Sequence, residues 1–324
     1  MLRSWLGTIA FRRYVAAISR RVAARRNGEA RTEGRWRRVR TWLIRHGDPV
    51  VMMAVGQRIL AMPLSHELPV YRALFASYDR TLAHLAKAHH DAGVPLVMID
   101  VGANIGDTMA VVFDVVPGAR FTCIEGNPRY VALLERNVTR LKADASVVAT
   151  YCDDGRGAAW QMTGDAHGSA RLAPLSQGGT VVATTTLDRL FAGDARVRDV
   201  TLLKIDTDGA DLRVLRGAAT LLRERQPMVY FEFHPSLLRE CGDDPDDLFP
   251  LLSAAGYSRA RLYTNRGETI GPVAVTPSFP ADAEARIDGR VVEYLDILAW
   301  APAHEAIVAG LTALESPHGQ SPRT

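Results

Sequence analysis

The sequence predicts an α/β protein built on a doubly wound, mostly parallel, Rossmann-like sheet with an α-helical and hairpin N-terminal extension. Three observations indicate this fold. After Pro95, short apolar segments alternate with helical segments of about 10–15 residues, as in strand–helix–strand units. A glycine-rich turn directly follows the first of these strands. The 324-residue chain is 47% hydrophobic and 23% charged, which is the composition of a folded globular protein.

The core domain is expected over residues 95–302. Its short apolar runs predict strands at 96–100, 120–125, 147–151, 180–184, 201–206, 228–233, 257–263 and 291–300. Its amphipathic runs predict helices at 105–116, 128–141, 210–223 and 244–255, and a short helix that Thr186 opens. In such sheets, ligands bind at the carboxyl ends of the strands, near the point where the strand order reverses. The polar residues that follow the strands are therefore the first candidates for a site.

A basic arm precedes the core at residues 1–47. Its first 46 residues hold 13 arginines and two acids, a net charge of +11, whereas the rest of the chain carries −8. Its apolar residues at helical spacing are Leu2, Trp5, Leu6 and Ile9, and the arginines that follow are Arg12, Arg13, Arg20, Arg21, Arg25 and Arg26. Two interpretations stay open. Residues 1–46 form a helix that lies on anionic lipid, or the arm packs on the body through Trp36 and Trp42.

A lid segment that leads into the sheet is expected at residues 48–94. Two apolar runs, at 50–55 and 58–62, predict a β-hairpin. The apolar periodicity over 71–85 predicts a single helix after the hairpin, and this helix is expected to end at Gly93 with Pro95 as a stop. At the other end of the core, residues 303–324 are expected to be a C-terminal tail.

Composition excludes several classes of protein. The apolar runs fall short of the roughly 18 residues that a membrane-spanning helix needs. The three cysteines (Cys123, Cys152 and Cys241) lie too far apart for a metal knuckle or a disulfide framework, which predicts a reducing, cytoplasmic location. The net charge of +3 gives no indication of a nucleic-acid partner, and nothing in the sequence indicates an oligomeric state.

The glycine-rich turn after the first core strand carries an acid where a dinucleotide site has its third glycine, and a second acid opens the turn. It runs from Asp100 through Gly102, Asn104 and Gly106 to Asp107. A dinucleotide site has Gly-x-Gly-x-x-Gly and a helix N-terminus open to a pyrophosphate, and Asp107 occupies the third glycine position. Because the two carboxylates would repel a diphosphate, the turn favours a ligand with a cationic end.

S-adenosylmethionine is such a ligand, since it carries a sulfonium, an ammonium and a ribose diol but no phosphate. Glu125 ends the second core strand, where a carboxylate can accept hydrogen bonds from both ribose hydroxyls. Asp153 or Asp154, just after the third strand, is the candidate partner of the exocyclic amine of adenine. The sequence therefore predicts an S-adenosylmethionine site at the ends of these strands.

Five segments of the core carry a family resemblance. They are MIDVGANIGDT (98–108), IEGNP (124–128), TLDRL (186–190), LLKIDTDGADLRVLRGA (202–218) and QPMVYFEFHP (226–235). Together they resemble the FkbM-type S-adenosylmethionine-dependent methyltransferases. This resemblance implies a class I methyltransferase fold and, usually, O-methylation of a hydroxyl on a sugar, polyketide or other secondary metabolite. Asn127 of the second segment joins the cofactor-binding candidates. The chain departs from the common pattern with Asp208 and Asp211 in place of glutamate, and with Gly126 in place of proline.

Methyl transfer to a hydroxyl needs an aligned nucleophile and benefits from a base. Asp206, at the end of the fourth core strand, is the candidate for contact with the substrate or the methionine end and for the base. His234 is the second catalytic candidate, because an imidazole with a pKa near 6.5 suits proton removal at neutral pH; alternatively it caps a helix or faces solvent. Asp206, Asp208 and Glu232 would also suit Mg²⁺, although their spacing does not require it. Lys204 is expected to be a salt-bridged structural residue.

The main functional hypothesis is an S-adenosylmethionine-dependent O-methyltransferase that acts on a hydroxyl of a sugar, glycolipid or secondary metabolite. A nicotinamide-dependent oxidoreductase is the second hypothesis, and Asp107 at the third glycine position disfavours it. A non-catalytic nucleoside-binding protein of the same fold is the third. The sequence does not identify the methyl acceptor.

Overall fold

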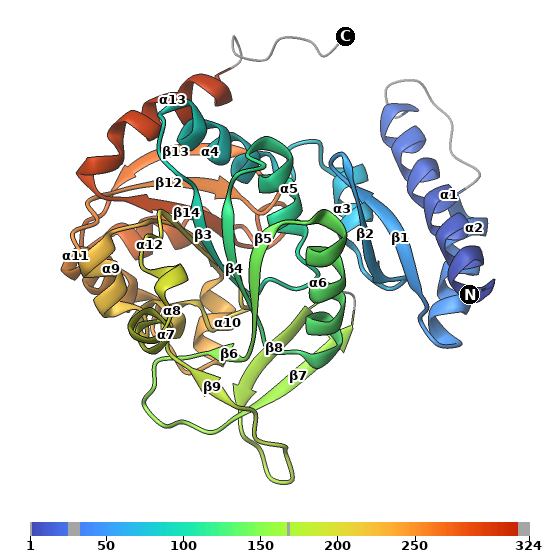
Figure 1. Ribbon diagram of the computed structural model, residues 1–324, viewed down its shortest axis with the longest axis horizontal. Helices are drawn as coiled ribbons and strands as arrows, with labels where there is room; N and C mark the ends of the chain where they lie inside the picture. Colours follow the sequence, from blue (N-terminus) through green and yellow to red (C-terminus); the bar gives the residue numbers. More distant parts are fainter. Residues whose placement is uncertain (1, 25–32, 167–168, 317–324) are drawn as a thin grey trace.

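The computed structural model describes residues 2–24, 33–166 and 169–316. Arg25 and Arg26 of the arm, and residues 317–324 of the expected tail, lie outside these ranges. The central element is an eight-stranded sheet with the order β13-β12-β14-β11-β10-β3-β4-β5 (Figure 1). The predicted doubly wound, mostly parallel sheet is therefore confirmed.

The strand order reverses between β3 and β10. The parallel strands are β3 (Val97–Val101), β4 (Arg120–Glu125), β5 (Asp144–Ala149), β10 (Leu202–Ile205), β11 (Met228–Phe233) and β12 (Arg259–Thr264). The antiparallel strands are β13 (Thr269–Ala274) and β14 (Leu295–Trp300). From β3 the chain builds outward through β4 and β5, and it then continues on the other side of β3 with β10 and β11. The carboxyl ends of β3 and β10 are thus where a ligand is expected.

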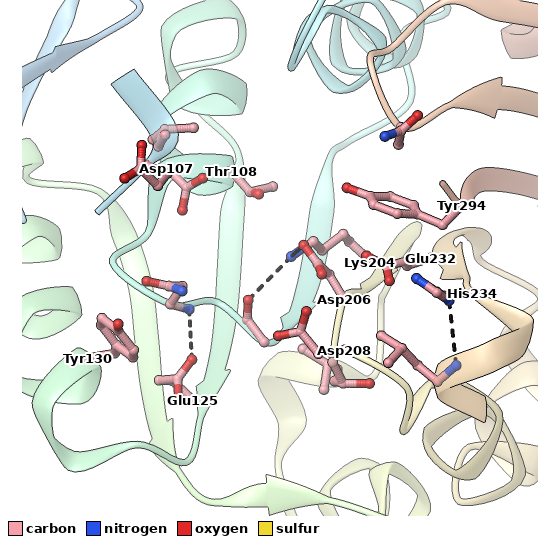
Figure 2. Close-up of a pocket in the computed structure, with 18 of the residues that line it drawn as sticks. Asp107, Thr108, Glu125, Tyr130, Lys204, Asp206, Asp208, Glu232, His234 and Tyr294 are labelled. Atoms are coloured by element: carbon pink, nitrogen blue, oxygen red, sulfur yellow. Dashed lines mark hydrogen bonds and ion pairs between the residues drawn. The ribbon is translucent and has the colours of Figure 1, made fainter. Parts of the chain in front are cut away.

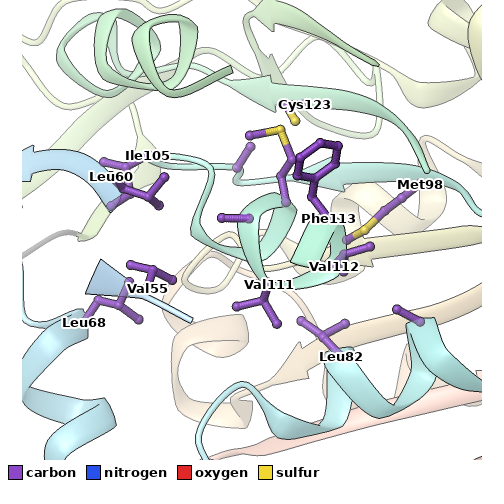
Figure 3. Packing of buried hydrophobic residues seen from close by; sticks show 14 of the residues in the cluster. Val55, Leu60, Leu68, Leu82, Met98, Ile105, Val111, Val112, Phe113 and Cys123 are labelled. Atoms are coloured by element: carbon purple, nitrogen blue, oxygen red, sulfur yellow. The ribbon is translucent and has the colours of Figure 1, made fainter. Parts of the chain in front are cut away.

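Two layers of helices cover the sheet. One layer contains α4 (Arg80–Asp91), α5 (Asp107–Val115), α6 (Pro128–Leu141) and α13 (Glu305–Glu315), and the other contains α7 (Leu187–Gly193), α8 (Asp211–Arg216), α9 (Ala219–Arg225), α11 (Leu248–Ala254) and α12 (Phe279–Glu284). Successive strand residues point to opposite faces, so Met98 packs in the first layer and Ile99 in the second. Figure 3 shows the first layer around Val112 and Phe113 of α5.

The N-terminal extension packs beside this sandwich (Figure 1). It contains α1 (Leu2–Ala24), α2 (Glu33–Arg45) and the predicted hairpin of β1 (Val50–Val55) and β2 (Arg58–Pro63). Phe11 and Ile18 of α1 are buried in the same core as the first helix layer. Trp36 is partly buried there, but Trp42 is 58% exposed, so the prediction that Trp42 packs on the body is wrong. Within the described ranges no helix is both long and apolar enough to cross a membrane.

The prediction of one continuous helix from residue 71 to Gly93 is wrong, although the helical segment does end just before Gly93. The chain instead forms α3 (Leu68–Leu74) and, after a turn, α4, which begins at Arg80. Asp79 precedes α4 in the left-handed conformation, with φ 64°, and its carboxylate pairs with Arg72 over 2.6 Å. This ion pair connects α3 to the start of α4 across the break, and the apolar periodicity of the sequence cannot predict it.

The helix predicted over 210–223 is also divided, into α8 and α9. Gly217 lies at the division, where a Cβ atom would come within 2.1 Å of the carbonyl oxygen of Asp153. The Asp188 carboxylate accepts hydrogen bonds from the backbone N–H groups of Thr220 and Leu221 at the start of α9. The TLDRL segment therefore supports this helix start.

Most of the remaining differences lie in short elements of the chain. Of the strand expected at 180–184 only β9 (Thr184–Thr185) forms, and it pairs with β6 (Tyr151–Cys152). Two elements of the core were not predicted, the edge strand β13 and the helix α12. The other unpredicted elements are short: the hairpin of β7 (Trp160–Ala166) and β8 (Ser169–Pro174), α10 (Pro235–Glu240) and three 3-10 turns, η1 (Ala195–Val197), η2 (Pro245–Asp247) and η3 (Pro302–His304). α13 packs against α4, so the expectation of a tail from residue 303 is wrong for the described residues up to 316.

Candidate active site

A pocket with a volume of about 480 Å³ opens at the carboxyl ends of β3, β4 and β10. This volume falls within the range of about 300–1,000 Å³ that small-molecule sites occupy. Its lining residues come from the segments 66–78, 101–108, 124–130, 150–152, 204–208, 232–237, 265–266 and 293–294, together with Leu172. The pocket therefore lies where the reversal of strand order predicts a ligand (Figure 2).

The turn after β3 lies directly against the end of β10. Gly102 has φ +78°, and a Cβ atom at this position would fall 1.8 Å from the carbonyl oxygen of Asp206. Only glycine combines this backbone conformation with so close an approach. The turn then enters α5 at Gly106, which also has positive φ. The predicted turn glycines thus bring the two strand ends together.

Glu125 is fixed by two backbone N–H groups. Its carboxylate accepts hydrogen bonds from Asn104 over 2.8 Å and from Asn127 over 2.7 Å. Burial raises the pKa of Glu125, and these two hydrogen bonds oppose the shift. A carboxylate offers about four acceptor positions, so this one can also accept from both hydroxyls of a diol. The side chain of Asn127 caps α6 by accepting from Arg129 N, so its role at the pocket is indirect.

Lys204 connects the strand ends through ion pairs. Its Nζ lies 3.0 Å from Oδ1 of Asp100, 3.2 Å from Oδ2 of Asp206 and 3.3 Å from the carbonyl oxygen of Gly102. Burial lowers the pKa of Lys204, but the neighbouring carboxylates outweigh burial and raise it, so the amine stays cationic. The expected salt-bridged role of Lys204 is confirmed. Asp100 is fully buried and does not line the pocket; it is the structural partner of Lys204.

Two acids of the pocket, Asp107 and Glu232, have raised pKa values. Asp107 begins α5 and lines the wall next to Thr108 (Figure 2). Burial raises the pKa of Asp107, and the pKa of Glu232 is raised well above its usual range by burial and then by the nearby Asp206. Both side chains would hold their charge better beside a bound cation.

The structure does not bring Asp153 and Asp154 into the pocket. Asp153 accepts a hydrogen bond from Oγ1 of Thr184, and the buried Asp154 carboxylate lies 3.9 Å from Arg213. The pocket wall at this strand end consists of residues 150–152. The assignment of either acid to the adenine amine is therefore not supported.

The two catalytic candidates both line the pocket, but in different ways. The Asp206 side chain is 49% exposed and faces Lys204 (Figure 2). His234 caps α10, because its Nδ1 accepts a long hydrogen bond of 3.5 Å from the backbone N–H of Leu237. An Nδ1 that accepts leaves the proton of the neutral ring on Nε2, which is then a donor. The ring of His234 also stacks on that of Tyr294, with centroids 5.8 Å apart. His234 thus caps a helix, as one of its predicted alternatives had it, and it also lines the pocket.

Asp206, Asp208 and Glu232 all line the pocket but do not converge on one point. Across the described part of the chain, no group of three or more histidine, cysteine or carboxylate side chains is arranged to hold a metal ion. The Mg²⁺ arrangement considered for these three residues is therefore not supported by their geometry.

Sequence reasoning missed His66, which follows β2. Its Nδ1 accepts from the backbone N–H of Leu68, and its Nε2 lies 3.2 Å from Oδ1 of Asn104 in the glycine turn. Burial lowers the pKa of His66 to about 4, so the ring is neutral at physiological pH. A neutral ring that accepts at Nδ1 donates from Nε2, which orients the Asn104 amide.

An aromatic wall was missed as well. The break between α3 and α4 brings Tyr71, Phe75 and Tyr78 to the pocket, with the rings of Tyr71 and Tyr78 5.7 Å apart. Tyr294 joins them from the segment before β14 (Figure 2). The Arg266 guanidinium lies 4.8 Å from the centre of the Phe75 ring. None of these residues belongs to a motif segment, and only the tertiary fold brings them together.

The fold and the site together define a class of protein. The doubly wound sheet, the glycine turn at its switch point and a pocket rich in carboxylates are those of a class I S-adenosylmethionine-dependent methyltransferase. A family comparison agrees, because the model of the methyltransferase FkbM domain matches residues 100–259. The chain thus carries an FkbM methyltransferase domain, as the resemblance implied, and it is an S-adenosylmethionine-dependent methyltransferase. This match favours the methyltransferase over the nicotinamide-dependent oxidoreductase.

Solved structures provide more distant comparisons. A precorrin-6y C5,15-methyltransferase from Geobacter metallireducens is 14% identical, with 68% of this chain and 87% of that chain covered and a TM-score of 0.34. A SAM-dependent methyltransferase from Aquifex aeolicus is 11% identical, with 71% and 96% covered and a TM-score of 0.35. No curated protein matches the chain.

Proposed function

We propose that the protein transfers the methyl group of S-adenosylmethionine to a hydroxyl group of a sugar, glycolipid or secondary metabolite. The observation that carries this proposal is the position of Asp206. Its half-exposed carboxylate stands in the pocket between the glycine turn, which suits the cofactor, and the wall formed by Tyr294 and Glu232. A hydroxyl is a weak nucleophile, so a carboxylate placed to accept its proton assists the transfer.

The residues of the cofactor side fit S-adenosylmethionine. Glu125 has acceptor capacity for the ribose diol, and Asp107 places negative charge near the cationic end. Segment 150–152, with the Tyr151 ring, provides a wall for the adenine. When bound, the cofactor would supply a methyl group that its sulfonium makes electrophilic, and the sulfur would keep the electron pair of the broken methyl–sulfur bond and leave as S-adenosylhomocysteine.

The residues of the acceptor side perform the rest of the reaction. Asp206 accepts the hydroxyl proton while the oxygen forms its bond to the methyl carbon, and Lys204 keeps the carboxylate oriented toward the pocket. His234, with its proton on Nε2, donates a hydrogen bond to the acceptor and does not serve as the base. Tyr78 and Tyr294 exclude water from this part of the pocket.

The composition of this wall supports a polyhydroxylated acceptor. Aromatic rings, chiefly Tyr71, Phe75 and Tyr294, offer apolar faces, while Glu293 and Asn265 offer hydrogen-bonding groups. Rings of this kind pack against apolar surfaces and polar groups orient a ligand. A sugar ring presents both kinds of surface at once. We also propose a reducing, cytoplasmic location, which the three free, buried cysteines support.

The proposal is tested with methyl-labelled cofactor and a panel of monosaccharides, glycolipids and polyketide alcohols. Label that appears as a methyl ether supports the proposal, whereas label on nitrogen or carbon contradicts the O-methylation. Cofactor binding without transfer to any acceptor that itself binds would favour the non-catalytic alternative. Repeating the productive assay with a chelator tests the Mg²⁺ alternative, and we expect no loss of rate.

A further inference from the structure

The outward side of the α1–α2 pair exposes large apolar side chains. While α1 buries Phe11 and Ile18 in the core, it leaves Leu2, Trp5 and Leu6 exposed by 71%, 60% and 43%. These three lie on consecutive turns of one helix face. Exposed apolar groups of this size, gathered at one place, mark interaction surfaces.

Trp42 of α2 lies at the same end of the helix pair. The guanidinium of Arg3 on α1 donates a hydrogen bond of 3.2 Å to the carbonyl oxygen of His46, just after α2. The ring of Trp42 stacks on that of His46 with centroids 4.5 Å apart and is 58% exposed. The first turns of α1 and the last turn of α2 therefore form one surface beside the N-terminus (Figure 1).

Arginine supplies most of the exposed charge around this surface. The exposed arginines of the two helices are Arg3, Arg12, Arg13, Arg20, Arg35, Arg37, Arg38 and Arg45. In the described parts of α1 and α2, none of these eight pairs with a carboxylate, whereas the buried Arg40 pairs with Glu67 over 2.9 Å. The exposed positive charge is thus available to an anionic partner.

We propose that this surface docks the protein on an anionic phospholipid bilayer. Leu2, Trp5, Leu6 and Trp42 enter the headgroup region, where tryptophan and aliphatic side chains are favoured, and the arginines contact lipid phosphates. A duplex nucleic acid would satisfy the arginines but would leave the apolar group in water. The proposal does not depend on which acceptor is methylated.

The test is co-flotation of the full chain with vesicles of phosphatidylcholine alone and of an equimolar mixture with phosphatidylglycerol. Deletion of the arm is unsuitable, because it would also remove Phe11 and Ile18 from the core. Two surface variants are used instead, Trp5→Ser with Trp42→Ser and Arg12→Glu with Arg13→Glu. The matched control is Val181→Ser with Val291→Ser, since these valines are 60% and 51% exposed elsewhere.

We expect binding to the anionic vesicles only, and weaker binding at high salt. The tryptophan variant should lose about tenfold in partitioning and the arginine variant about fivefold or more per residue, with melting temperatures like that of the control. Absence of vesicle binding, equal binding to both vesicle types, or tryptophan variants that bind like the parent would overturn the proposal. Binding to a DNA duplex without binding to vesicles would overturn it too.

Discussion

Arg40 of the basic arm donates a hydrogen bond of 2.9 Å from Nε to the carbonyl oxygen of Leu64, at the base of the loop that carries His66. The same guanidinium donates to the carbonyl oxygen of Ser65 and to Oε1 of Glu67, each over 2.9 Å. It is 6% exposed and lies 4.4 Å from the centre of the Phe11 ring. The arm thus supports a wall of the pocket although it does not line it.

Arg40→Ala should therefore weaken cofactor binding from a distance. Loss of these hydrogen bonds frees the loop, so His66 no longer orients Asn104, and we expect the dissociation constant for S-adenosylmethionine to rise about tenfold. Isothermal titration measures this, with Arg38→Ala on the exposed side of α2 as the control. A folded Arg40→Ala protein with the parental affinity would contradict this coupling.

Glu125→Ala should weaken S-adenosylmethionine binding by about 1.5–3 kcal/mol, which is the range for hydrogen bonds to a charged group. The reason is that the fixed carboxylate has acceptor capacity for the ribose diol. Titration of the variant against the parent and against Glu135→Ala, an exposed acid on α6, measures the effect. An unchanged affinity in the folded variant would contradict the assignment of Glu125 to the cofactor site.

Asp206→Asn should lower kcat by about 10²–10⁴-fold with a smaller change in KM, because an amide cannot accept the hydroxyl proton. His234→Gln should lower kcat by less than about tenfold, since His234 is assigned as a donor. Steady-state kinetics on the acceptor found in the panel separates the two. A larger kcat loss in the His234 variant would exchange their assigned roles.

The stability of the protein should fall in mild acid through His89. This ring is fully buried, neither of its nitrogens has a hydrogen-bond partner among the described residues, and burial lowers its pKa to about 4. As the pH falls below about 6.5, the unfolded chain therefore binds a proton at this histidine that the folded chain does not bind. Up to about 3 kcal/mol of stability is lost between about pH 6.5 and pH 4.

His89→Leu should remove this contribution, so that its free energy of unfolding depends less on pH over that interval than that of the parent. Urea unfolding at a series of pH values measures the difference between the two proteins. His90→Leu, an exposed neighbour on the same helix, serves as the control and should behave like the parent. Equal pH dependence in the parent and His89→Leu would show that the buried ring does not titrate as described.

The sequence was most informative where local signals and burial agree. The bounds of β4 and α6 follow from an apolar run and from the Asn127–Pro128 helix start, and the structure confirms both. Asp79 shows the opposite case, because an ion pair to Arg72 and a left-handed backbone interrupt a continuous apolar periodicity.

The site shows the same contrast between residues that sequence patterns predict and residues that only the tertiary fold brings together. Glu125 ends β4, whose bounds were predicted correctly, and Asp206 directly follows β10, which is one residue shorter at each end than predicted. Both residues line the pocket. The third strand ends at Ala149, and the chain then pairs briefly as β6, so Asp153 turns toward Thr184 and away from the pocket. His66 belongs to a segment that only tertiary packing brings to the glycine turn, and no spacing in the sequence could indicate it.

The most direct measurement is a crystal structure of the protein with S-adenosylhomocysteine. We expect the nucleoside in the pocket beside the glycine turn, with both ribose hydroxyls within hydrogen-bond distance of Glu125 and the sulfur facing Asp206. A nucleoside bound elsewhere, or one whose ribose makes no contact with Glu125, would contradict the account.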